Sequence, residues 1–130
     1  MSMTDKHMNV LLVEDDDIVR DTTSAMLERA GFFVTGVENG VAGFAALQQT
    51  SFDAVVCDVR LPFLGGQDFF ARVQSDFPEL VTRLVFVSGF PTDPGVRETA
   101  EATGRPMVPK PYTVDQLVTA VRGVIDLQAD

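Results

Sequence analysis

Residues 53–58 read Asp-Ala-Val-Val-Cys-Asp, and this stretch decides how the chain is expected to fold. Residues 53–57 predict a strand in which Ala54 to Cys57 form a continuous apolar run. An apolar run without alternating polar positions is typical of a central strand in a parallel sheet that is covered on both faces. Asp58 therefore follows directly on the strand that we expect at the centre of the fold.

The pattern around this strand repeats, because short β-rich runs alternate with longer amphipathic segments five times along the chain. This alternation predicts an α/β fold, a parallel sheet covered by five helices. The last run is brief and lies between Pro106 and Pro109, which suits an edge strand. The predicted strands comprise residues 9–13, 33–37, 53–57, 83–87 and a short piece around Met107 and Val108.

Apolar spacing and end signals locate the first three helices. The first is expected over about residues 17–30 with a stop at Gly31, the second over about residues 41–49, and the third ends before Pro78. The predicted faces are Val19, Thr23, Met26, Leu27 and Ala30 in the first helix, Val41, Phe44, Ala45 and Gln48 in the second, and Phe69, Phe70, Val73 and Phe77 in the third.

The last two helices should differ in how firmly they are held. The fourth opens with Asp93 as its N-cap and Pro94 in its first turn and runs to Thr103, so we expect a short, lightly held helix. Its apolar anchors are Val96, Ala100 and Ala102. The fifth opens with Thr113 and Gln116 in a capping-box relation. Its apolar stripe comprises Val114, Leu117, Val118, Val121, Val124 and Ile125.

Length and composition limit the classes of function. The 130 residues fit one domain, expected over residues 9–128, and no apolar run is long enough to cross a bilayer. Asp and Glu total 19 against 10 Lys and Arg, and this net charge of -9 argues against direct binding to nucleic acid or anionic lipid. Cys57 is the only cysteine, so no intrachain disulfide is expected.

The two ends of the chain add a prediction each. Residues 1–8 are polar and lack the apolar stretch of a signal peptide, so we expect a disordered lead-in and a cytoplasmic protein. His7, in that lead-in, is expected to be a solvated residue and not a ligand or base. After the fifth helix the chain stops, so we expect no attached effector domain.

Polar residues follow four of the predicted strands at the point where each strand ends. They are Glu14 and Asp15, Asp58, Ser88 and Lys110. Function in an open parallel sheet collects at the carboxyl tips of the strands. Carboxylates gathered there repel one another unless a hard cation lies among them, and Mg²⁺ needs only one or two protein carboxylates beside water and a phosphate. We therefore expect Asp15 and Asp58 to bind Mg²⁺, with Glu14 reaching it through water.

The polar residues at the strand ends include every group that phosphoryl transfer to a carboxylate needs. Such transfer needs positioning and charge neutralisation more than a strong base. Asp58 supplies the nucleophile, Lys110 a compact positive charge and Ser88 a hydroxyl donor. Taken singly, Asp58 fits a turn residue, Ser88 an ordinary loop and Lys110 a solvated charge, and Asp16 or Asp17 fits a helix cap. Complementary residues at four strand tips make coincidence a poor explanation.

These residues resemble the response-regulator receiver family over nearly the whole chain. The matching motifs are Leu11-Leu12-Val13-Glu14-Asp15-Asp16, Asp58 followed by Leu61-Pro62 and Gly66, Val87-Ser88-Gly89, and Lys110-Pro111-Tyr112. The resemblance implies a flavodoxin-like, doubly wound sheet in the order 2-1-3-4-5. It implies that the chain is a signalling domain, not an enzyme in the usual sense, which assists its own phosphorylation and dephosphorylation.

The resemblance also implies roles for individual residues. Asp58 would accept a phosphoryl group from a partner histidine kinase or histidine phosphotransferase. Mg²⁺ would be bound by Asp15, Asp58 and the backbone carbonyl of Arg60, with Glu14 in support. Ser88 and Lys110 would hold the phosphoryl group, and the Lys110-Pro111 bond would be cis. Phosphorylation would reshape the face formed by the fourth helix, fifth strand and fifth helix, which a downstream protein or a second receiver would read.

Three positions depart from the family pattern. Met107 stands where the family often has an aromatic switch residue, three positions before the lysine, so Met packing would have to replace the usual rotamer switch. Arg60 and Phe90 flank the path by which the family admits hydrolytic water. Because both are large, we expect the phosphoryl group to be lost slowly.

Competing functions fit the residues less well. An FMN carrier would need a phosphate-binding loop rich in Ser, Thr and Gly after the first strand, where this chain has three acids. A magnesium-dependent phosphotransferase or nuclease of the Toprim kind would need an acid two places after Asp58, where Arg60 stands. A degenerate receiver used only for docking would not need the intact acidic, Ser and Lys set. A stand-alone regulator and the receiver portion of a hybrid sensor kinase both fit the sequence.

Overall fold

The computed structural model describes residues 8–62 and 64–129. Except for Met8, the predicted lead-in, with His7, lies outside the described residues. The elements in chain order are β1 (Asn9–Val13), α1 (Asp17–Arg29), β2 (Phe33–Val37), α2 (Gly40–Gln49), β3 (Ala54–Asp58), α3 (Gly66–Asp76), the 3-10 helix η1 (Pro78–Arg83), β4 (Leu84–Ser88), α4 (Pro94–Thr103), β5 (Met107–Pro109) and α5 (Val114–Ala129). None of the helices in this described part of the chain is long and apolar enough to cross a membrane.

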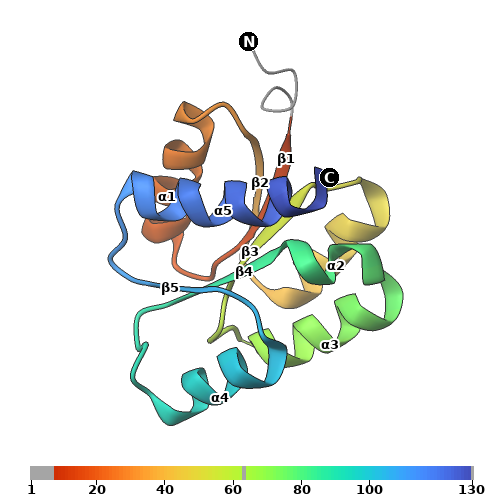
Figure 1. Ribbon diagram of the computed structural model, residues 1–130, viewed down its shortest axis with the longest axis vertical. Coiled ribbons are helices and arrows are strands. Elements are labelled where there is room, and N and C mark those ends of the chain that lie inside the picture. Colours follow the sequence, from red (N-terminus) through yellow and green to blue (C-terminus); the bar gives the residue numbers. More distant parts are fainter. Residues whose placement is uncertain (1–7, 63, 130) are drawn as a thin grey trace.

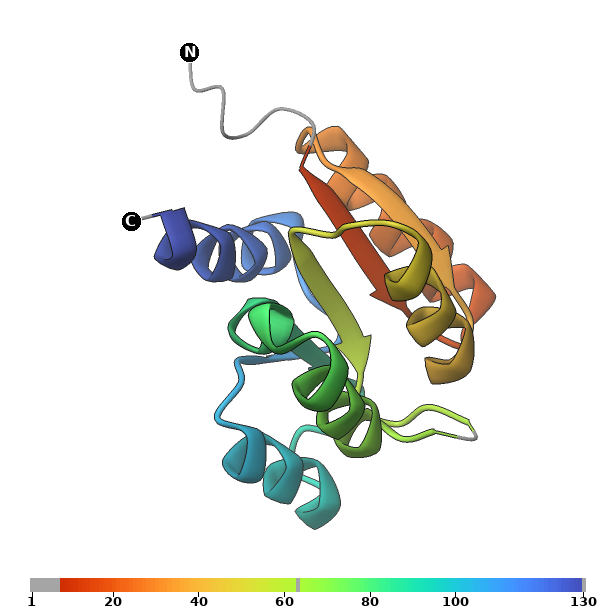
Figure 2. The same ribbon diagram turned by 90° about the vertical axis from the view of Figure 1, so that its right-hand side faces the viewer.

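The strands form one parallel sheet in the order β2-β1-β3-β4-β5, which confirms the predicted order. β3 lies between β1 and β4, and all five of its residues are buried, as the continuous apolar run predicts. Because the strands are parallel, their carboxyl ends meet at one edge, toward which the arrowheads of β1, β2 and β3 point (Figure 2). That edge carries the residues singled out by the sequence.

Helices cover both faces of the sheet (Figure 1). Successive strand residues alternate between the two cores. On one face Leu12 and Val56 pack under α1 and α5, which contribute buried residues such as Leu27 of α1 and Leu117 of α5. On the other face Leu11, Val13, Val55, Cys57 and Phe86 pack under α2, α3 and α4.

The helix ends follow the predicted signals. Asp16 caps α1 through its Oδ1, which accepts from the backbone N–H groups of Ile18 and Val19. Gly31 follows α1 with a φ of 102°, a conformation that favours glycine. Thr113 and Gln116 form the predicted capping box, each side chain accepting from the backbone N–H of the other residue.

In the second helix Phe44 is buried as predicted, but the other three residues of the predicted face are wrong by one position. Val41, Ala45 and Gln48 are exposed, and the buried residues of α2 are Gly40, Gly43, Phe44 and Leu47. The glycines explain the difference, because they let α2 approach the sheet closely. A Cβ atom on Gly43 would lie 3.1 Å from Cγ2 of Val13 and 3.2 Å from Cε1 of Phe69. The spacing of large apolar residues does not reveal a close approach of the backbone at a glycine.

Smaller differences occur near β3 and β4. Both strands begin and end one residue later than predicted, so Asp58 is the last residue of β3 itself. Asp53 precedes the strand, where its Oδ2 accepts from the backbone N–H of Asn9 at 2.7 Å. The 3-10 helix η1 was not predicted; it begins at Pro78, directly after the C-cap of α3. α4 is anchored by Val96 and Thr99, and the predicted anchor Ala102 is exposed.

Candidate functional site

Backbone hydrogen bonds between neighbouring strand ends place the polar residues at the carboxyl edge. The N–H of Val59, just after Asp58, donates to the carbonyl of Val87 at 3.1 Å. The N–H of Lys110 donates to the carbonyl of Ser88 at 2.7 Å. β1 ends beside β3, with Val13 opposite Cys57. The sheet ladder therefore continues one residue beyond β3 and β5, and the pairing of neighbouring strands holds the tips of β1, β3, β4 and β5 in register.

Glu14, Asp15 and Asp58 form a cluster in which one carboxylate oxygen of each lies within 4.8 Å of the others. Glu14 is 1% exposed and Asp58 is 6% exposed, whereas Asp15 faces solvent. Asp16, the next acid, is committed to the cap of α1. Three consecutive acids thus have different roles, because Asp16 is the N-cap of α1, whereas Glu14 and Asp15 lie between the end of β1 and that cap.

Lys110 is the counter-charge of this cluster. Its Nζ donates to Oε1 of Glu14 at 2.5 Å and to Oδ2 of Asp58 at 2.7 Å. Burial alone would lower the pKa of Lys110, but its bonds to Asp58 and Glu14 raise the pKa above the ordinary value. The ammonium therefore stays charged.

The charge of Glu14 depends on the pH near neutrality. Burial, together with the nearby charge of Asp58, raises the pKa of Glu14 to about 7, although its bond to Lys110 acts in the opposite direction. Its Oε1 is bound to Lys110, and its Oε2 accepts from the backbone N–H of Asp16 at 3.2 Å. Both oxygens are thus engaged by the protein, which suits a supporting role beside a cation.

The remaining predicted residues lie around Asp58. Oδ1 of Asp58 accepts from the backbone N–H of Arg60 at 2.8 Å, so each oxygen of this carboxylate has a donor. Ser88 is fully buried at the tip of β4, and its Oγ accepts from the backbone N–H of Phe90 at 3.0 Å. The Lys110-Pro111 peptide bond is cis, as the resemblance implies.

The donor set fits a hard divalent cation. Carboxylate oxygens are the ligands that Mg²⁺ prefers, and Asp15 leaves the cluster open to solvent, where such an ion keeps its waters. Three carboxylates against one ammonium also leave the cluster net negative, which further positive charge relieves. The side chains that would hold the ion are those of Asp15 and Asp58, with Glu14 behind them.

The three departures from the family pattern lie in different surroundings. Met107 is half-buried and packs against the core beneath α2, α3 and α4. The guanidinium of Arg60 forms an ion pair with Asp93, the N-cap of α4. It also lies over the exposed ring of Phe90, 4.7 Å from the ring centroid. Asp93 is a residue that the sequence marks only as a helix cap.

An apolar hollow lies beside the cluster, between α1 and the segment after β5. Its volume is about 400 Å³, and Lys110 lines it as well as the carboxylate cluster. Ile18 is 77% exposed at its rim, and the hydroxyl groups of Tyr112 and Thr23 are hydrogen-bonded at 2.7 Å. The other lining residues are Val19, Thr22, Met26 and Pro111.

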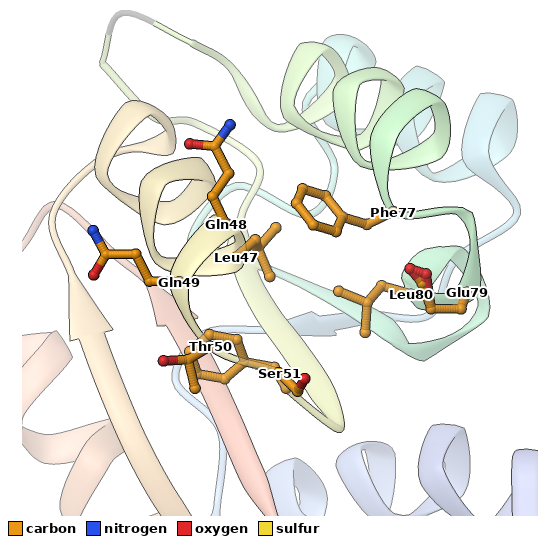
Figure 3. A pocket seen from close by; sticks show the side chains of 9 residues that line it. Leu47, Gln48, Gln49, Thr50, Ser51, Phe77, Glu79 and Leu80 are labelled. Carbon is orange, nitrogen blue, oxygen red and sulfur yellow. The ribbon is translucent and has the colours of Figure 1, made fainter.

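A second hollow of about 250 Å³ lies at the amino ends of β3 and β4, between α2, the end of α3 and η1. Leu47, Phe77 and Leu80 point into it, and Glu79 is the one charged residue among its lining residues (Figure 3). It is separated from the carboxylate cluster by the length of the strands, and it brings no reactive groups together.

Comparison with known proteins is consistent with this geometry. The family described as "Response regulator receiver domain" matches residues 10–122. The transcriptional regulatory protein CseB of Streptomyces avermitilis is 32% identical over 117 residues, which cover 90% of this chain and 48% of that protein. The response regulator receiver protein CpdR of Brucella abortus is 26% identical over 116 residues, 89% of this chain and 95% of that protein.

Solved structures share the fold. The chemotaxis response regulator CheY4 of Vibrio cholerae superposes with a TM-score of 0.81 at 25% identity, covering 92% of this chain and 99% of that one. The chain thus spans about half the length of the CseB protein and nearly the whole length of CpdR and CheY4.

Proposed function

The chain belongs to the response regulator receiver family of two-component signalling, and we propose that its Asp58 accepts a phosphoryl group from a histidine kinase or histidine phosphotransferase in a magnesium-dependent reaction. The observation that carries this proposal is the ammonium of Lys110, which lies 2.7 Å from Oδ2 of a buried aspartate at the centre of a carboxylate cluster. A lysine so placed neutralises negative charge that arrives at that oxygen.

The chemistry is a displacement at phosphorus. An oxygen of Asp58 attacks the phosphorus of a phosphohistidine, an O–P bond forms as the N–P bond breaks, and the imidazole leaves with the bond's electron pair and takes up a proton. Lys110 is positioned beside the accepting carboxylate, and the Ser88 hydroxyl would turn from the N–H of Phe90 to donate to a phosphoryl oxygen. A bound Mg²⁺ would supply further neutralisation of the phosphoryl oxygens. The result is a signalling domain that assists its own phosphorylation and dephosphorylation.

The apolar hollow supports α1 as the docking side for the phosphodonor. Ile18 is exposed beside Lys110, and an exposed large apolar side chain next to a reactive site favours a protein partner over a free small molecule. Asp17 is already paired with Arg20 at 2.5 Å, but the exposed acid Asp21 on the same helix favours a partner surface that carries a basic residue beside an apolar centre.

We propose the α4, β5 and α5 face as the output surface. α4 is held by few groups: buried Val96, the bond from Thr99 to Oε1 of Gln67, and the Arg60–Asp93 ion pair. A lightly held helix moves at small energetic cost when Ser88 and Lys110 rearrange. The reader of this face would be a downstream protein or a second receiver, because the net charge of -9 disfavours direct contact with nucleic acid.

The test is incubation with acetyl phosphate and Mg²⁺, followed by measurement of the intact mass. Wild-type protein should gain the mass of one phosphoryl group, and Asp58→Asn should gain none. Asp68→Asn, an exposed acid on α3, is the matched control and should be modified like the wild type. Wild-type protein that folds but takes up no phosphate would instead indicate a receiver used only for docking.

A further inference from the structure

The position of Arg60 poses a problem for a cation site. Arg60 follows Asp58 by two residues, and its backbone N–H is bound to the Asp58 carboxylate at 2.8 Å. Its side chain thus starts at the rim of a cluster that holds three carboxylates against one ammonium. A guanidinium on a flexible stem is attracted by such a cluster, and it forms strong, bidentate bonds to carboxylates. A guanidinium bound there would take the place of a divalent ion.

The structure shows where this guanidinium is held instead. Arg60 is paired with Asp93 and lies over the ring of Phe90, 4.7 Å from its centroid. Asp93 is itself fixed, because its Oδ1 caps α4 by accepting from the N–H of Gly95 at 2.8 Å, which leaves Oδ2 for Arg60. The bond to Gly95 lowers the pKa of Asp93, although slight burial opposes it, and Arg60 lowers it further, so the carboxylate stays charged.

We propose that Asp93 is a positioning residue that holds the Arg60 guanidinium over Phe90 and away from the carboxylate cluster, so that a divalent cation meets no second positive charge there beside that of Lys110. The inference rests on the magnesium site of the proposed function. Asp93 touches neither the reacting atoms nor the ion; it acts through Arg60. Its role is distinct from its capping of α4, and the two roles can be separated by substitution.

The substitution that separates them is Asp93→Asn. Asn is as good an N-cap as Asp, so the start of α4 is kept, whereas the charge that holds Arg60 is lost. The released guanidinium should then compete for the cluster and weaken divalent binding about fivefold, the upper range for one partly exposed ion pair. Arg60→Ala keeps the backbone at that position and removes the competitor, so it should bind the ion at least as tightly as the wild type. The double variant should match Arg60→Ala.

The experiment is a titration with Mn²⁺, which shares the oxygen-ligand preference of Mg²⁺ and whose free form is counted by electron paramagnetic resonance. Asp15→Asn serves to show that the ion counted is the one at the cluster. If Arg60→Ala restores the ion binding of Asp93→Asn, the proposal is supported. A merely structural role of Asp93 predicts no such recovery, because removing a second side chain would not repair the structure. Asp93→Asn binding like the wild type, or a double variant as weak as Asp93→Asn, overturns it. Failure of the wild type itself to bind Mn²⁺ would remove the proposed function as well.

Discussion

The carboxyl edge and the amino edge of the sheet differ in what they enclose. At the carboxyl edge, Glu14 and Asp58 are buried beside Lys110, and the negative charge exceeds the positive. At the amino edge, apolar side chains such as Leu47 and Leu80 line the hollow of Figure 3 together with uncharged polar side chains, and Glu79 is the one charged residue of its lining. Buried charge that its neighbours do not fully balance costs stability and is typical of functional sites. The comparison teaches that enclosed charge, more than the size of a hollow, distinguishes a reactive edge from a structural one.

The sharpest test of this contrast is Lys110→Met, which removes the charge and keeps much of the length. We expect the rate of phosphorylation by acetyl phosphate to fall about 100- to 1000-fold, the usual effect of losing one group that stabilises charge in a transition state. The rate is measured from the time course of intact mass. A fall of less than tenfold would mean that the carboxyl edge does not depend on this lysine.

Leu80→Ala should show the opposite signature at the amino edge. Leu80 is 6% exposed and packs in the core next to the hollow, so its truncation should lower the free energy of unfolding by about 2–3 kcal/mol. The phosphorylation rate should stay at the wild-type value. Urea unfolding measures the first and mass spectrometry the second, with exposed Glu79→Ala as a control that changes neither. A clear loss of phosphorylation in folded Leu80→Ala would break the separation of the two edges.

The pH dependence of ion binding tests the charge of Glu14. Because burial raises the pKa of Glu14 to about 7, its proton must leave before the cluster carries full charge. Apparent Mg²⁺ affinity should therefore weaken as the pH falls below 7, by up to about tenfold per unit. Calorimetry in buffers of different ionisation enthalpy should detect proton release, and Glu14→Gln should abolish it. Equal proton release in wild type and Glu14→Gln would assign the titration elsewhere.

The same shift affects the stability of the ion-free protein. In the folded protein the carboxyl group of Glu14 has a pKa of about 7, whereas in the unfolded chain its pKa is about 4.5. The folded state thus binds more protons between these values, so this group's contribution to stability is present below pH 4.5 and is lost as the pH rises through 7.

The smallest expected effect concerns the rim of the carboxyl edge. Arg60 and the 59%-exposed ring of Phe90 lie against each other beside Asp58, and we expect them to hinder the entry of hydrolytic water. Phe90→Ala and Arg60→Asn should each speed the loss of the phosphoryl group several-fold. The decay is followed by intact mass after removal of acetyl phosphate. Decay no faster than in the wild type would refute the role of these side chains.

Much of the fold could be predicted because apolar spacing records burial. The continuous run of β3 is buried as expected, and so is the stripe of α5 from Leu117 to Ile125, although its first residue, Val114, is exposed. The face of α2 could not be predicted in this way, since Gly43 makes its closest contact by having no side chain. The end of β3 was missed for a related reason: Asp58 is polar, yet it is buried as a strand residue because Lys110 pairs with it.

The candidate site likewise has a part that could be predicted from the sequence and a part that could not. The convergence of Glu14, Asp58 and Lys110 was predictable, because parallel strands bring their tips to one edge whatever the loops do. The pairing of Arg60 with Asp93 was not, because it joins two loops that are 33 residues apart and depends on side-chain geometry. The sequence also did not reveal that both oxygens of Glu14 are engaged by the protein.

The thiol of Cys57 has a practical consequence. It is fully buried in β3, and burial raises its pKa well above the ordinary value, so reagents that modify thiolates should leave it untouched in the folded protein. The chain has no tryptophan and this one cysteine. A cysteine introduced on the outer side of α4 would therefore be the single labelling position, and a fluorophore attached there could report helix movement without any change to the wild-type core.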